Sequence, residues 1–235
     1  MPGLYFLKRS ILAAAMLVAA LGLMALGPAD RLVTAMPASL ATTTGNAQIS
    51  REVFDEMNLM RADPQAYVAV LQAYRDQFRG DVVIRPGRIN IQTREGVAAV
   101  DEAIAFLRRQ SPMQPLEPDA VLGMAAADHA RDQGPAGYIG HYSSDGWDFA
   151  TRVSRRGGEP YGGENISYGY DTAREVIIQL LVDDNVLDRG HRVNLFRPGY
   201  VRAGVGCGPH TVFSYMCVID YGYAPTRKPM RASYP

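Results

Sequence analysis

The chain has 235 residues and equal numbers of basic and acidic side chains, 24 of each, so it carries no net charge. A nucleic-acid partner normally requires a basic stripe on the protein, and the balanced composition argues against one. Once an N-terminal targeting segment is set aside, about 190 residues remain, which is enough for one ordinary domain with a sizeable core.

The N-terminus has the pattern of an export signal. Lys8 and Arg9 precede an apolar run over residues 11–26, and a basic start followed by an apolar stretch is typical of a secretory signal. We predict a signal peptide over residues 1–35. The alternative is an uncleaved anchor, because the run approaches the length that spans a bilayer. Either way the protein is secreted or extracytoplasmic. Segment 36–48, with Ser, Thr and Gly, is predicted to be a flexible leader.

Apolar residues at helical spacing predict a series of helices along the rest of the chain. The first begins at Ser50 as N-cap and ends at Asp63, and the others run from Pro64, from Thr93 to Arg109, from about Pro118 to Gln133, from Trp147 to Arg156 and from the capping box of Thr172 and Glu175. Extended runs are predicted at Glu164 to Tyr168, Ala203 to Cys207 and Tyr215 to Tyr221. Helices interleaved with a few strands that end in a hairpin indicate a sheet covered by helices.

The two cysteines, Cys207 and Cys217, lie on either side of a turn-like stretch that contains Gly208 and Pro209. An antiparallel hairpin would bring them opposite each other, and an exported protein favours the disulfide. Two buried free thiols are the alternative.

Three polar residues each follow a glycine and predict a composite site: His141, Glu164 and His191. Glycine lets the backbone bend sharply or approach another segment closely. Two imidazoles and a carboxylate suit zinc or another divalent metal. The same groups can do acid–base work, with the glutamate orienting a histidine. A hydrogen-bonded network that only pins the loops is the third interpretation.

The other two histidines are interpreted differently. His129 lies on the apolar face of its helix, which predicts a core histidine with a hydrogen-bonded ring. His210 falls in the hairpin turn and is expected to be solvated. Asn165 begins a glycosylation sequon, but it lies within the candidate site and is discounted for that reason.

The order of these motifs resembles the CAP superfamily, which comprises cysteine-rich secretory proteins, antigen 5 and pathogenesis-related 1 proteins, and its bacterial branch in particular. The resemblance rests on an ordered set: Leu122…Ala125-Ala126…His129-Ala130, Gly140-His141-Tyr142-Ser143, Gly163-Glu164-Asn165-Ile166, Gly190-His191-Arg192 and Gly204-Val205-Gly206. It implies an α+β fold, a three-layer α-β-α sandwich with a central, mainly antiparallel sheet and a large cleft.

The resemblance also implies a cleft tetrad that includes His141, Glu164 and His191, with the two histidines able to hold a divalent metal. The fourth member is expected at Asp183, and Asp184 is the alternative register. As a metal-dependent, peptidase-like hydrolase, the protein would use Glu164 as general base and Asp183 to orient a histidine.

The chain departs from the family pattern at residues 63–113. Relatives connect the first helix to the segment that corresponds to Pro115 and Leu116 by only a few residues. Segment 63–113 is too long and too well patterned for a bare loop, so we predict a helical insertion within a CAP domain spanning 49–223, followed by a tail over 224–235. Our hypothesis is that the insertion packs beside the cleft or forms a partner surface.

The expected role is binding of a metal, a small apolar molecule or an extracellular polymer in the cleft. Lipid, a cell-envelope polymer or another protein are the candidate partners, and the metal-dependent hydrolase is the second interpretation.

Overall fold

The computed structural model describes residues 38–225, with side chains from Gly45 onward, and all of these residues belong to one structural unit. The predicted signal peptide or anchor and most of the C-terminal tail lie outside the described residues. Within residues 38–225, no helix is both long enough and apolar enough to cross a membrane.

Seven helices lie in the described part of the chain: α1 (Ala38–Ala62), α2 (Pro64–Arg75), α3 (Val97–Arg109), α4 (Ala120–Ala136), α5 (Phe149–Arg155), α6 (Ala173–Val182) and α7 (Gly190–Leu195). The strands are β1 (Phe78–Arg79), β2 (Val82–Val83), β3 (Ile91–Gln92), β4 (Glu117–Pro118), β5 (Gly162–Tyr168), β6 (Tyr200–His210) and β7 (Ser214–Tyr223).

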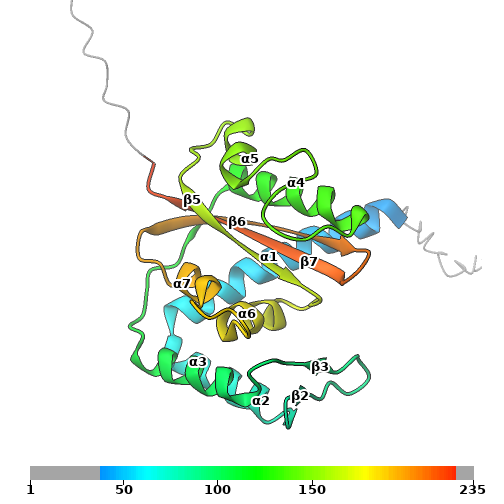
Figure 1. Ribbon diagram of the computed structural model, residues 1–235. Helices are drawn as coiled ribbons and strands as arrows, with labels where there is room; N and C mark the ends of the chain where they lie inside the picture. The colour runs from blue at the N-terminus through cyan, green and yellow to red at the C-terminus, as the bar shows by residue number, and fades with distance from the viewer. Residues whose placement is uncertain (1–37, 226–235) are drawn as a thin grey trace, which may run out of the picture. The chain divides into compact units, whose positions relative to one another are not determined.

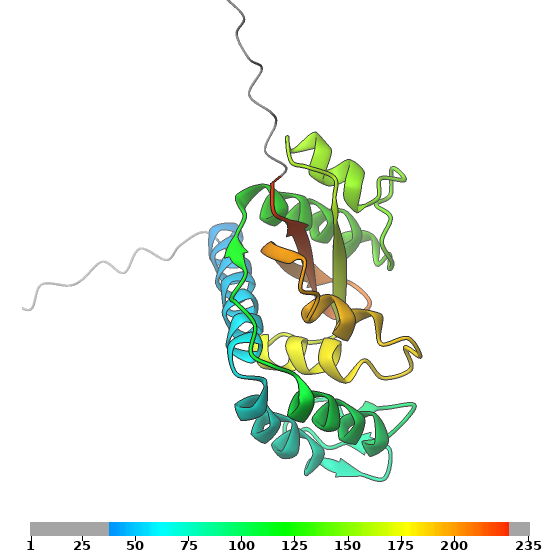
Figure 2. The same ribbon diagram turned by 90° about the vertical axis from the view of Figure 1, so that its left-hand side faces the viewer.

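The main sheet has four strands in the order β4-β6-β7-β5, and the three short strands β1 to β3 form a second sheet. Strand β7 pairs antiparallel with both β5 and β6, while β4 runs parallel to β6. Helices α4 and α5 lie on one side of the main sheet, and α1 and α6 lie on the other (Figures 1 and 2). The predicted α+β fold, an α-β-α sandwich around a mainly antiparallel sheet, is confirmed.

Glycines on β6 let α4 lie unusually close to the sheet. A Cβ atom at Gly204 would lie 1.9 Å from the amide nitrogen of Gly123, and one at Gly206 would lie 2.2 Å from that of Ala127. No side chain fits at these two positions unless the helix moves away. This contact explains the Gly204-Val205-Gly206 motif. The end of α4, where the loop carrying His141 begins, is equally close to the sheet, because a Cβ atom at Gly134 would lie 2.2 Å from the Pro209 carbonyl oxygen.

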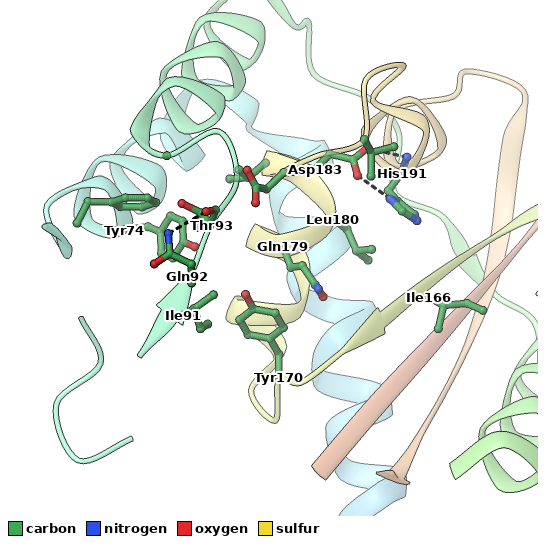
Figure 3. A pocket seen from close by; sticks show the side chains of 15 residues that line it. Tyr74, Ile91, Gln92, Thr93, Ile166, Tyr170, Gln179, Leu180, Asp183 and His191 are labelled. Carbon is green, nitrogen blue, oxygen red and sulfur yellow. Dashed lines mark hydrogen bonds and ion pairs between the residues drawn. The ribbon is translucent and has the colours of Figure 1, made fainter. Parts of the chain in front are cut away.

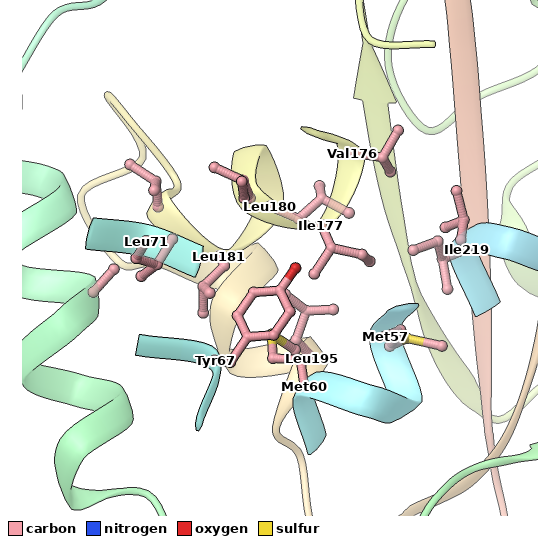
Figure 4. Close-up of a cluster of buried hydrophobic side chains, with 14 of the residues drawn as sticks. Met57, Met60, Tyr67, Leu71, Val176, Ile177, Leu180, Leu181, Leu195 and Ile219 are labelled. Carbon is pink, nitrogen blue, oxygen red and sulfur yellow. The ribbon is translucent and has the colours of Figure 1, made fainter. Parts of the chain in front are cut away.

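The principal core lies on the other side of the sheet and includes the insertion (Figure 4). Its members include residues of α1, α2, α3, α6, α7, β6 and β7, among them Met57, Met60, Tyr67, Leu71, Ile177, Leu180, Leu181, Leu195 and Ile219. Burying a side chain such as Leu71 contributes about 1.5–3 kcal/mol. The insertion is therefore an integral part of the core.

The prediction of a flexible leader over 36–48 is wrong from residue 38 onward, because α1 already begins at Ala38. Ser50 is not its N-cap, since the Ser50 hydroxyl donates within the helix to the carbonyl oxygen of Asn46 (2.6 Å). The Tyr215 hydroxyl on β7 donates to Asn46 Oδ1 (2.8 Å), and the Cys207 amide on β6 donates to Ser50 Oγ (3.0 Å). These contacts with the sheet stabilise a helix whose composition alone is weak.

Both helices predicted in the insertion are present. Asp63 caps α2 by accepting a hydrogen bond from the Ala66 amide (2.9 Å), with Pro64 as the first helical residue. Thr93 does not cap α3, because that helix begins after Gly96 and the Thr93 hydroxyl donates instead to the Asp81 carbonyl oxygen (2.7 Å).

The hairpin of β6 and β7 confirms the predicted disulfide, because Cys207 and Cys217 are directly paired across the strands and bonded. The prediction that His210 is solvated is wrong, since its side chain is buried. His210 Nε2 donates to the Tyr138 carbonyl oxygen (2.9 Å), and Nδ1 accepts from the amides of Val212 and Phe213. The imidazole thereby links the hairpin turn to the loop after α4.

Removing the disulfide should lower the free energy of unfolding without changing the fold. Closing a loop of this length contributes about 2–3 kcal/mol in the chain-entropy model. We expect that loss when Cys207→Ala and Cys217→Ala are combined, measured by urea denaturation. Wild-type protein in a thiol reductant is the matched control and should lose the same amount; unchanged stability in both would contradict a stabilising role.

Candidate functional site

The first part of the site is a hydrogen-bonded pair between His141, in the loop after α4, and Glu164 on β5. The imidazole Nδ1 lies 2.7 Å from Glu164 Oε1. The His141 side chain is 54% exposed, whereas that of Glu164 is 3% exposed. The pair therefore presents an imidazole to solvent and orients it with a buried carboxylate.

Arg152 on α5 lies beneath this pair and was missed by the sequence analysis. Its guanidinium forms an ion pair with Glu164 Oε2, and both side chains are almost fully buried. A second guanidinium nitrogen donates to the carbonyl oxygens of His141 (3.0 Å) and Trp147 (2.9 Å). One arginine therefore positions both the carboxylate and the loop that carries His141. Its spacing with Phe149 and Val153 on one helical face was the available signal.

The charge of Glu164 depends on these neighbours. Burial alone would raise the pKa of Glu164, but the hydrogen bond from His141 and the positive charge of Arg152 outweigh it and lower the pKa. Glu164 is therefore ionised, and both carboxylate oxygens already have partners.

A second carboxyl group, Asp220 on β7, is the direct cross-strand partner of Glu164 and was also missed. Its side chain is fully buried, and neither carboxyl oxygen accepts a hydrogen bond from a described residue. Burial, and secondly the negative charge of Glu164, raise the pKa of Asp220 well above its ordinary value. Asp220 is therefore held as a neutral acid beside an ionised one.

The second part of the site is formed by Asp183, the C-cap of α6, and His191 in the first turn of α7. Asp183 Oδ1 lies 2.6 Å from His191 Nδ1, while Oδ2 accepts from the amides of His191 (2.9 Å) and Arg192 (3.3 Å). The Asp183 side chain is 2% exposed and that of His191 is 28% exposed. Of the two candidate acids, Asp183 is the one that pairs with His191.

Strand β5 connects the two pairs. Asn165, the residue after Glu164, donates from Nδ2 to the His191 carbonyl oxygen (3.0 Å), and Asn194 of α7 donates to Asn165 Oδ1 (3.0 Å). Asn165 is fully buried, which agrees with discounting it as a glycosylation site. The His141 imidazole and the His191 backbone are thus bound to consecutive residues of one edge strand.

The loop that carries His141 is fastened from below by His129, which is a buried core histidine as predicted. His129 Nε2 lies 2.9 Å from the Gly140 carbonyl oxygen, and Nδ1 lies 3.0 Å from Ser143 Oγ. Burial lowers the pKa of His129, so the ring is neutral. Gly140, at φ 102°, makes the turn that lets the next side chain point outward.

The donor set for a metal is small. Each site histidine uses Nδ1 for a carboxylate and leaves Nε2 without a hydrogen bond to any described residue. Residues 45–225 contain no group of three or more His, Cys, Asp or Glu side chains arranged to hold a metal ion. The set therefore falls short of the three protein ligands of a typical catalytic zinc site.

The insertion lies beside this cleft, as one half of the hypothesis predicted. A cavity of about 260 Å³ is lined by insertion residues such as Tyr74 and Ile91 and by Asp183 and His191 from the cleft (Figure 3). The second half, a partner surface, stays a prediction.

The family model described as "CAP: Cysteine-rich secretory protein family" matches residues 101–221. This match covers half of the chain and includes both histidine–carboxylate pairs and both cysteines. The chain therefore belongs to the CAP, or cysteine-rich secretory protein, family.

Similar solved structures are bacterial and distant. An extracellular protein containing an SCP domain from Bacillus anthracis is 19% identical; the match covers 54% of this chain and 38% of that one, with a TM-score of 0.38. An outer surface protein from Borrelia burgdorferi is 19% identical over 63% of this chain and 100% of its own, with a TM-score of 0.42.

The CAP domain of enterococcal PrgA is 17% identical over 51% of this chain and 56% of its own, with a TM-score of 0.35. Our chain thus spans well under half the length of the Bacillus protein. No curated protein matches the sequence.

Replacing Asp220 with asparagine should change how stability depends on pH. A raised pKa means that the folded state holds a proton which the unfolded state releases above about pH 4. Wild-type stability should therefore fall, relative to Asp220→Asn, by about 1.4 kcal/mol per pH unit until the pH reaches the folded-state pKa.

Urea denaturation of both proteins between pH 5 and pH 8 measures this difference, and taking the difference removes the contributions of other groups. Asp55→Asn, at an exposed position on α1, is the control and should run parallel to wild type. A difference between Asp220→Asn and wild type that stays constant with pH would contradict a neutral Asp220.

Proposed function

We propose that this protein acts outside the cytoplasm as a binding protein, and that its cleft holds one ligand through the Nε2 atoms of His141 and His191. One observation carries the proposal. In each pair the imidazole is partly exposed and donates through Nδ1 to a buried carboxylate, so that Nε2 faces outward. Side chains oriented in this way are prepared to bind before a ligand arrives.

The two carboxylates act in this proposal by positioning the histidines. A general base needs a free oxygen within reach of the proton that it removes. Glu164 has one oxygen on His141 and the other on Arg152, and its lowered pKa makes it a weak base. Asp183 is occupied by one imidazole and two amides. This occupancy favours binding over the catalytic roles that we considered for Glu164 and Asp183.

A location outside the cytoplasm is supported by the disulfide, which persists mainly in oxidising compartments. The basic and apolar N-terminal pattern points the same way. Whether the apolar segment is removed or remains as an anchor does not alter the proposal, because both place the cleft on the same side of the membrane.

A metal-dependent hydrolase is the second candidate, and one observation favours it. A histidine that donates its other ring N–H to a carboxylate is typical of metal-binding histidines, and His141 and His191 both do so. Zinc or another divalent metal would then be held by two imidazoles and completed by solvent or substrate, and bound water is what such a metal activates.

Zinc is the simplest probe that requires both Nε2 atoms at one place. We expect calorimetry to show zinc binding to wild type and a loss of at least about tenfold in affinity, about 1.4 kcal/mol, when His141→Ala and His191→Ala are combined. Tyr142→Ala, an exposed neighbour of His141, is the control and should bind as wild type does. Equal affinities for wild type and the double variant would exclude a shared histidine site.

The zinc affinity of wild-type protein should also fall below about pH 6, because imidazole must be neutral to bind a metal.

The two candidate functions differ in turnover. We expect wild-type protein to leave fluorescently labelled casein uncleaved, with zinc and without it. Zinc-dependent cleavage that disappears when both histidines are replaced by alanine would reject the binding role and establish the hydrolase. The same preparations used for calorimetry serve here, so that loss of folding is detected independently.

A further inference from the structure

The cavity between the insertion and the cleft has walls from two distant parts of the chain. The insertion contributes one wall, which includes residues of α2 and β3. The other wall comes from α6, the loops on either side of it, β5 and α7 (Figure 3). Its volume of about 260 Å³ is close to the lower end of the roughly 300–1,000 Å³ of small-molecule sites. A molecule of about ten to fifteen non-hydrogen atoms matches that size.

About half of the lining residues are aromatic or aliphatic. Tyr74 and Ile91 come from the insertion, and Ile166, Tyr170 and Leu180 come from β5, the following loop and α6. Apolar surface of this kind favours a ligand with an aromatic or branched aliphatic body.

Polar groups make up much of the remaining lining, including the side chains of Gln92, Thr93 and Gln179. The hydroxyls of Tyr74 and Tyr170 make no hydrogen bond to a described residue, and burial raises the pKa of both phenols, that of Tyr170 to about 12. Both hydroxyls are therefore neutral. His191 lies on the other side of α6 from Tyr74 in Figure 3, and it also lines the cavity.

The insertion wall is held firmly against the cleft. Asp184 accepts hydrogen bonds from the amides of Arg94 and Glu95, both at 2.8 Å. Arg189, just before α7, pairs with Glu95 and Glu102, in each case at 2.6 Å. Because the wall is fastened by these contacts, a ligand would not have to order it, which reduces the cost of binding.

The charges around the cavity select the ligand's polar group. Asp183 and Asp184 both line it, so an anionic ligand would meet two carboxylates. His191 Nδ1 pairs with Asp183, so Nε2 is the remaining ring nitrogen, and it accepts a hydrogen bond when it carries no proton. A hydroxyl on a neutral ligand carries no negative charge toward the two aspartates and can donate a hydrogen bond to His191 Nε2.

We propose that this cavity binds a small neutral molecule with an aromatic or branched aliphatic body and a hydroxyl that donates to His191 Nε2, with the insertion residues Tyr74 and Ile91 determining which bodies fit. The proposal rests on the proposed function in that it uses His191 as a ligand-binding group, but it requires neither His141 nor a metal.

Thymol is a suitable probe, because it is neutral, carries a branched aliphatic group on a phenol and has the required size. We expect calorimetry to detect thymol binding to wild type and Ile91→Trp to weaken it by about tenfold or more, since the larger ring fills the cavity. The matched control is Ile89→Trp, two residues earlier and 87% exposed, which should change the affinity less than about twofold. Equal affinities for the two variants, or no thymol binding to wild type, would overturn the proposal.

The polar group is tested with two analogues of thymol. Cymene lacks the hydroxyl, and cuminate carries a carboxylate, so both should bind more weakly than thymol. His191→Phe should remove the preference for thymol over cymene while the cavity still binds the apolar body. A preference for cuminate would reject the neutral-ligand assignment.

Failure of this proposal is distinguishable from failure of the proposed function. Zinc affinity should be unchanged by Ile91→Trp, because Ile91 contacts neither Nε2 atom in the proposed metal arrangement. Normal zinc binding without thymol binding would support the shared histidine site and reject the cavity proposal. Thymol binding without zinc binding would support the cavity proposal and reject the shared histidine site.

Discussion

The buried ion pair between Arg152 and Glu164 is the interaction on which the geometry of the cleft depends. Removing one partner of such a pair leaves an uncompensated buried charge, which costs about 3–5 kcal/mol. Arg152 also donates to carbonyl oxygens at both ends of the loop from His141 to Trp147. The contact that neutralises the carboxylate therefore also determines where His141 lies.

The same pair explains the neutral state of Asp220. One guanidinium compensates one carboxylate, and a second buried negative charge on the neighbouring strand would have no partner. Protonation of Asp220 is the less costly arrangement. The second histidine is positioned by a different means, because Asp183 uses two backbone amides of α7 in place of an arginine. Both solutions place a buried carboxylate behind an exposed imidazole.

The insertion is built into the structure around His191. Its helices share the principal core with α1 and α6, so it cannot be an independent appendage. Its connection to the cleft runs through Asp184 and Arg189, residues next to the site pair on α6 and α7. The two adjacent aspartates therefore have different roles: Asp183 orients His191, and Asp184 holds the insertion wall beside it.

By itself, the sequence determined most of the longer elements and three or more of the candidate site residues. Helical spacing located both insertion helices, the hairpin spacing predicted the disulfide, and the glycine-led motifs identified His141, Glu164 and His191, because these signals lie within a few neighbouring residues. Only the tertiary structure decided that α1 begins at Ala38, that His210 is buried, and that Arg152 and Asp220 belong to the site. Each of these features depends on contacts between segments far apart in the chain. Burial and charge compensation arise from such contacts, and no local pattern encodes them.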